Sequence, residues 1–116
     1  MERDQTVTLQ QLSDSAKQNT VAIFAKFYIR EFQHANLEIL SSYPVDAEIG
    51  ELNHFLAMNS SFHPNQLFEL LVQDYHAYLY RVLMSLELRF RANGTPSFGD
   101  WTNWYEQKYE AVMVEE

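Results

Sequence analysis

The chain has 116 residues, the length of one domain, and its 47% hydrophobic content is ordinary for a globular protein. Its formal net charge of −8 disfavours nucleic-acid binding, and its lack of cysteine excludes disulfides, thiolate metal sites and cysteine nucleophiles. Neither a signal peptide nor an apolar stretch long enough to span a membrane is evident. We therefore expect one cytoplasmic domain over residues 1–116, with residues 1–7 disordered or forming an extended arm.

The first predicted helix begins near Thr8 and ends near Ser42. Thr8 and Gln11 have the spacing of a capping box, and a second possible start lies at Ser15. Apolar residues then recur at helical spacing. The helix is expected to stop before Pro44, because a residue that precedes proline is pushed out of helical geometry.

Three further helices are predicted. A short second helix follows a candidate cap at Asp46 and ends in the segment MNSSFHPN. The third runs from Pro64 to Asn93, which precedes a glycine, and it is apolar over most of its circumference. The fourth begins near Ser97. These elements predict an all-α fold, a compact four-helix bundle-like domain with a long central third helix.

Glu-x-x-His occurs twice, at Glu31 with His34 and at Glu51 with His54. Carboxylates and imidazoles three residues apart on a helix are ligands in di-iron four-helix bundles. Helical geometry directs the first pair toward the apolar side and the second pair toward water. One inward pair is too few for such a site, so we expect no cofactor. A divalent metal at Glu31 and His34 remains an alternative.

Three arginines, Arg81, Arg89 and Arg91, fall on the late part of the predicted third helix. They suggest two interpretations. The side chains form a clamp for an anion or a carboxylate, or they complement the negative end of the helix dipole and pair with the acidic fourth helix.

The fourth predicted helix is rich in large aromatic residues: Trp101, Trp104, Tyr105 and Tyr109. Trp and Tyr are enriched at the centres of protein interfaces, because they bring a large rigid area and a polar group. These positions span a wider arc than one packing seam needs. We therefore expect a partner or subunit interface here, beside the alternative that the residues only dock the helix.

No catalytic constellation or phosphate-binding loop is evident, so the sequence does not predict an enzyme. The size, acidity and aromatic surplus favour a regulatory protein of the antitoxin, immunity or anti-activator type. Such a protein acts by occluding another protein and is often a homodimer. A ligand- or metal-binding bundle that uses Glu31 and His34 is the first alternative. A DNA-mimic inhibitor is the second, although the three arginines interrupt its acidic surface.

Overall fold

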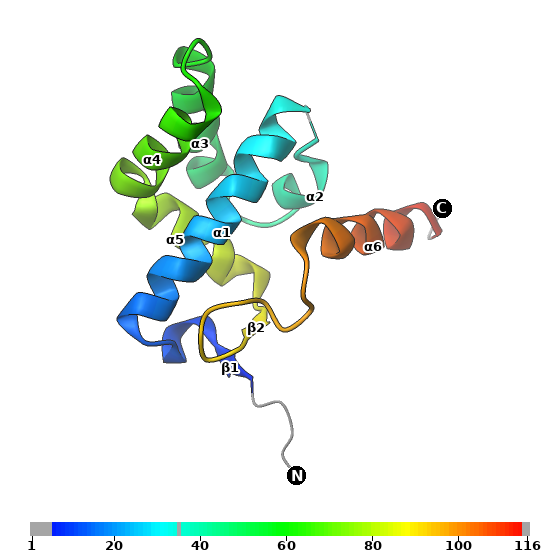
Figure 1. The fold of residues 1–116 in the computed structure, drawn as a ribbon. Helices are drawn as coiled ribbons and strands as arrows, with labels where there is room; N and C mark the ends of the chain where they lie inside the picture. Colours follow the sequence, from blue (N-terminus) through cyan, green and yellow to red (C-terminus); the bar gives the residue numbers. More distant parts are fainter. Residues whose placement is uncertain (1–5, 35, 115–116) are drawn as a thin grey trace.

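The computed structural model describes residues 6–34 and 36–114 of the chain. Most of these residues are helical, which confirms the all-α prediction (Figure 1). The α-helices are α1 Asp14–Gln33, α2 Glu38–Ser41, α3 Asp46–Met58, α4 Pro64–Asp74, α5 His76–Leu86 and α6 Trp101–Val114. A 3-10 helix, η1 Leu9–Gln11, and two short strands, β1 Val7–Thr8 and β2 Arg89–Phe90, complete the described part.

The amino-terminal segment is held to the body by strand pairing. β1 pairs antiparallel with β2, with Val7 opposite Phe90 and Thr8 opposite Arg89. The Phe90 side chain is fully buried, so this pairing lies at the edge of the core. Residues 1–5, which belong to the expected disordered or extended arm, lie outside the described part of the chain.

The first α-helix begins later than predicted. The Thr8 N–H donates to Gln11 Oε1 at 2.9 Å, as a capping box requires, but the turn that follows is only η1. The α-helix starts after Ser13, whose Oγ accepts from the N–H of Ala16 at 3.2 Å. The predicted starts at Thr8 and Ser15 are therefore both wrong as starts of α1.

The first α-helix also ends earlier than predicted, at Gln33 rather than near Ser42. The N–H of Asn36 donates to the carbonyl of Glu31 at 2.8 Å, and His34 Nδ1 donates to the carbonyl of Arg30 at 2.8 Å. The Asn36 N–H thus satisfies a carbonyl group that a continued helix would have used, whereas the Arg30 carbonyl also accepts from the backbone N–H of His34. The chain then forms α2 as a separate single turn.

The predicted third helix is two helices. α4 ends at Asp74 and α5 begins at His76, with Tyr75 between them in a non-helical conformation (φ −119°, ψ 22°). The Tyr75 ring packs on Phe55 of α3, with ring centroids 4.7 Å apart. The segment predicted as the third helix is apolar on most sides because its two halves, α4 and α5, pack on different neighbours. α4 packs mainly on α1, whereas α5 packs on α3 and α1.

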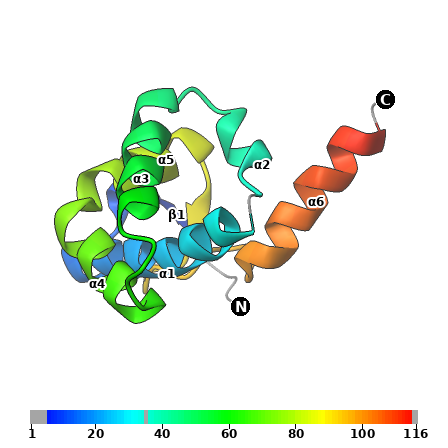
Figure 2. The same ribbon diagram turned by 90° about the horizontal axis from the view of Figure 1, so that it is seen from above.

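The central element is α1. It packs mainly on α4 and α5, while α3 packs on α5 (Figures 1 and 2). Phe24, Ala25 and Tyr28 in its middle are fully buried. Glu51 and His54 on α3 are exposed, as helical geometry predicts, while Leu52 faces the core.

The segment between α5 and α6 is not helical. α5 ends at Leu86, seven residues before the predicted end at Asn93, and the next residue, Glu87, takes a left-handed conformation (φ 53°). Gly99 has a φ of 95°, which a helix cannot include, so α6 starts at Trp101 instead of near Ser97. The Asp100 carboxylate accepts from the N–H of Thr102 at 3.0 Å and caps the new helix.

α6 extends away from the other helices, as both views show (Figures 1 and 2). Its contacts are chiefly with α1 and α2. The radius of gyration is 14.5 Å, against about 13 Å expected for a globular chain of this length. The described helices thus form a packed group with one protruding helix, and the expected four-helix bundle arrangement is not confirmed.

Gly94 and Gly99 both have a φ of 95°, so they allow a matched test of the contact between Gly94 and the backbone of Ala16. A Cβ on Gly94 would lie 2.4 Å from the carbonyl oxygen of Ala16, whereas a Cβ on Gly99 meets nothing within 4 Å. We expect Gly99→Ala to lower the free energy of unfolding by about 1–2 kcal/mol through backbone strain alone. Gly94→Ala should lower it by roughly 1–3 kcal/mol more, because the steric clash adds to the strain. Urea unfolding measures both, and equal losses would show that the contact with Ala16 relaxes freely.

Candidate functional site

The base of α6 is fixed by an aromatic cluster. The Trp101 ring centroid lies 5.0 Å from that of Phe24 and 5.5 Å from that of Phe27, and the second pair is stacked. Tyr105 meets Phe27 edge to face at 5.3 Å. These contacts determine where α6 leaves the body of the protein.

This cluster accounts for most of the aromatic surplus on α6. Trp101, Trp104 and Tyr105 are only 4%, 6% and 3% exposed, so the chain itself covers three of the four residues that were predicted to form a partner or subunit interface. The fourth, Tyr109, is half-buried. A partner that binds beside α6 therefore has to contact Tyr109 and its polar neighbours rather than the two indole rings.

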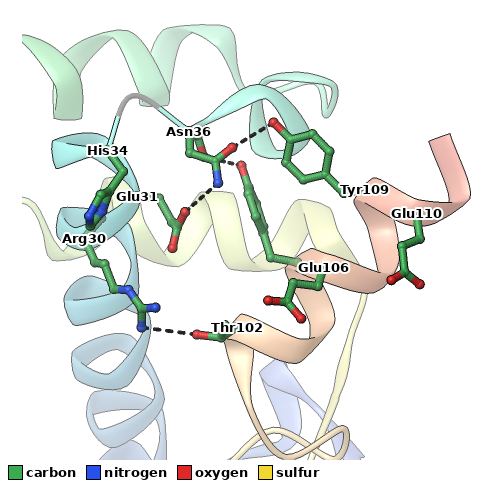
Figure 3. Close-up of a pocket in the computed structure, with 9 residues that line it drawn as sticks. Arg30, Glu31, His34, Asn36, Thr102, Glu106, Tyr109 and Glu110 are labelled. Atoms are coloured by element: carbon green, nitrogen blue, oxygen red, sulfur yellow. Dashed lines mark hydrogen bonds between the residues drawn. The ribbon is translucent and has the colours of Figure 1, made fainter. Parts of the chain in front are cut away.

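Asn36 connects α6 to the end of α1 (Figure 3). Its backbone carbonyl accepts from the Tyr105 hydroxyl at 2.6 Å, and its Nδ2 donates to Glu31 Oε1 at 3.0 Å. The Tyr109 hydroxyl faces both Asn36 Oδ1, at 2.8 Å, and the Glu38 carboxylate. Because a hydroxyl has one proton, Tyr109 donates to one of these two acceptors at a time.

A groove of about 620 Å³ lies between α1 and α6, beside Asn36. We call it the α1–α6 groove, and Figure 3 shows the side chains that line it. One wall is formed by Arg30, Glu31, His34 and Asn36, and the other by Thr102, Tyr105, Glu106, Tyr109 and Glu110. Thr102, Glu106 and Glu110 are spaced four residues apart, so they share one face of α6.

The charge of the groove is mainly negative. Three carboxylates, those of Glu31, Glu106 and Glu110, line it together with one guanidinium, that of Arg30. Arg30 Nη1 donates to Thr102 Oγ1 at 3.3 Å and so crosses from one wall to the other near the base of α6.

Glu31 and His34, the candidate metal ligands, both line this groove but turn to different partners. Glu31 is buried and bonds to Asn36, whereas His34 is exposed and donates to the carbonyl of Arg30. Within residues 6–34 and 36–114, no group of three or more His, Asp or Glu side chains is placed to hold a metal ion. What the groove provides is an arrangement of hydrogen-bond acceptors and tyrosine rings.

The two groove tyrosines remain protonated well above neutral pH. Burial raises the pKa of Tyr105 to about 12, and the nearby charge of Glu31 acts in the same direction. The hydrogen bond to Glu38 is the main cause that raises the pKa of Tyr109 above its ordinary value of 10.0. Both hydroxyls therefore act as hydrogen-bond donors, and both rings are neutral surfaces.

The structure distributes the three arginines of the proposed anion clamp over separate elements. The Arg81 guanidinium, on α5, lies 5.3 Å from the centre of the Tyr78 ring. Arg89 lies in β2, where its Nη2 donates to the carbonyl of Thr6 at 2.6 Å. Arg91 is exposed on the turn after β2. The sequence predicts that all three arginines lie on one helix. In the structure Arg89 and Arg91 are not helical, so the three do not share a helix face.

Comparison of the chain with protein-family models, with curated proteins and with solved structures gives no significant match. Among the helices described here, none is both long and apolar enough to cross a membrane.

Sequence reasoning identified Glu31, His34, Tyr105 and Tyr109 as candidate site residues but missed the residues that complete the groove. Asn36 was overlooked because its four hydrogen bonds depend on the break after α1 and on the position of α6. Thr102, Glu106 and Glu110 carried a usable signal, because their i, i+4 spacing gives the fourth helix a polar stripe.

Tyr105→Phe tests the connection between α6 and Asn36. At pH 8 we expect it to lower the free energy of unfolding by about 1–2 kcal/mol, because the hydrogen bonds to the Asn36 carbonyl and from the Ile39 N–H are lost. The folded pKa of Tyr105 is raised from 10.0 to about 12, so the wild type loses the associated stability as the pH rises between these values. The wild type and the variant should therefore converge over this range by on the order of 2 kcal/mol.

Urea unfolding at pH 8, 10 and 11.5 measures this convergence. Tyr80→Phe is the control, because Tyr80 does not line the α1–α6 groove. A gap between wild type and Tyr105→Phe that stays constant across the three pH values would contradict the prediction.

Proposed function

We propose that the chain is a small regulatory protein that binds another protein and occludes it, and that the α1–α6 groove receives a basic segment of this partner. The antitoxin, immunity and anti-activator types all act in this way. The observation that carries the proposal is a groove of about 620 Å³ in which three carboxylates face one guanidinium. Grooves of this volume fall within the range that proteins use for binding side chains and small ligands.

The overall charge supports a basic partner. The chain has 16 acidic and 8 basic residues, so its net charge of −8 attracts a cationic protein over long range. Charge complementarity of this kind speeds association and excludes acidic competitors. The groove adds local acceptors, so the long-range field and the proposed contact surface favour the same class of partner.

A second copy of the chain does not suit the groove, because two surfaces of the same negative charge repel each other. The proposed homodimer would therefore use another surface. The last residue of α3, Met58, and Phe62 in the connection to α4 are 70% and 40% exposed. Exposed apolar side chains of this size are the residues that subunit contacts cover.

Affinity capture from the native cell tests the proposal with two variants of equal charge change. Glu106→Lys with Glu110→Lys alters the groove, while Glu51→Lys with Glu69→Lys alters exposed positions on α3 and α4. We expect the groove variant to recover at least about tenfold less of the proteins bound by the wild type, since reversing a contact charge costs several kcal/mol. The control variant should recover them normally.

Circular dichroism is the control for folding, and both variants should have the helical content of the wild type. Equal recovery by the wild type and the groove variant would contradict the groove as the contact surface. Equal loss in both variants would show that only the total charge matters, which also contradicts it.

A further inference from the structure

We propose that the α1–α6 groove binds an arginine side chain of the partner, with the guanidinium held between Glu31 on α1 and Glu106 on α6. This inference rests on the proposed function and specifies the chemistry that the groove recognises. It is carried by Glu31, a buried carboxylate that lines the groove.

Glu31 is only 7% exposed and lies in the last turn of α1. Among the residues that the structure describes, its side-chain hydrogen bond comes from Asn36 Nδ2, a neutral donor. The neighbouring Arg30 guanidinium donates to Thr102 instead. A buried carboxylate costs free energy unless a cation or several donors compensate it, and the negative end of the helix dipole increases this cost. The side chain therefore presents an uncompensated charge to the groove.

The opposite wall provides a second carboxylate at a suitable place. Glu106 is exposed on the α6 face that lines the groove, and Figure 3 shows its side chain directed into the space between the helices. Glu110 follows one turn later on the same face. A cation that enters the groove consequently meets the carboxylate of Glu106 on one side and that of Glu31 on the other.

The groove suits a guanidinium better than an ammonium group. A guanidinium is planar, carries five N–H donors and is weakly hydrated, so it loses less on entering a partly buried site. It also packs on aromatic rings, and Tyr105 and Tyr109 both line the groove. A lysine ammonium has three donors and is more strongly hydrated, so it would make fewer contacts in the groove and lose more hydration on entering it.

Titration of ¹⁵N-labelled protein with Nα-acetyl-arginine amide, followed by NMR, tests this assignment. We expect saturable shifts at the backbone amides of Glu31, Asn36 and Glu106. Nα-acetyl-lysine amide should bind at least fivefold more weakly, and Nα-acetyl-citrulline amide, the neutral analogue of arginine, should not saturate. Binding of the citrulline or lysine probe as tight as that of arginine would overturn the proposal.

Glu31→Gln removes the charge and keeps an oxygen that accepts from Asn36. It should weaken binding of the arginine probe at least tenfold, and Glu106→Gln, at an exposed position, should weaken it at least threefold. Glu51→Gln on α3 is the matched control and should leave binding unchanged. Full retention of binding in Glu31→Gln and Glu106→Gln would overturn the proposal.

The thermal midpoint separates a binding role of Glu31 from a structural one. Because the unliganded carboxylate is uncompensated, Glu31→Gln should raise Tm or leave it unchanged, and saturating arginine probe should raise Tm in the wild type only. A fall in Tm of more than about 5 °C, which corresponds to roughly 1 kcal/mol, would assign the charge a structural role and overturn the proposal.

The two proposals fail in distinguishable ways. If the groove variant loses the captured proteins but the arginine probe does not bind, the arginine assignment alone is overturned. If the probe binds as expected but the captured proteins are the same with the wild type and the groove variant, the proposed partner contact is overturned. In that case the groove is a site for a free guanidinium ligand.

Discussion

The stacking of Trp101 against Phe27 is the contact on which the arrangement of the candidate site depends. It fixes the first turn of α6 against α1, so that the next turns of α6 face the carboxyl-terminal end of α1. Asn36 then joins the two elements through the hydroxyls of Tyr105 and Tyr109. An apolar anchor thus sets the position of α6, and a small polar network sets the chemistry of the groove.

The groove combines a rigid wall with a more exposed one. Glu31 belongs to α1, which is packed on α4 and α5. The hydrogen bond from Asn36 limits the positions that the Glu31 carboxylate can take. Glu106 and Glu110 are exposed on the protruding α6. A buried charge on a rigid element selects what is bound, because it tolerates few positions of the ligand. In the proposed complex with a basic partner, the exposed charges on the other wall mainly attract the ligand, and salt weakens this attraction.

The residues that could be predicted from the sequence are those whose position depends on helical spacing alone. The apolar spacing of α1 placed Phe24 and Phe27 in the core, and the spacing of α3 placed Glu51 and His54 in solvent. The breaks at Tyr75 and Asn36 could not be predicted in this way. Neither residue is a proline or a glycine, and tertiary contacts hold both: Tyr75 with Phe55, and Asn36 with α6. The groove was missed because it exists only where the break near Asn36 and the packing of Trp101 on Phe27 place α6 beside α1.

Because α6 is anchored mainly at one end, the width of the groove depends on the angle at which this helix leaves the body of the protein. The first turn is embedded in aromatic rings, whereas the outer part is held to the body through the Tyr109 hydroxyl and its two acceptors. From Trp101 to Glu110 the helix rises about 13 Å, so a tilt of about 5° at the base moves the outer carboxylate by about 1 Å. A small change of the helix angle at the base is therefore amplified at the outer end. A change of this angle alters the width of the groove at its outer end and leaves the aromatic contacts at the base of the helix in place.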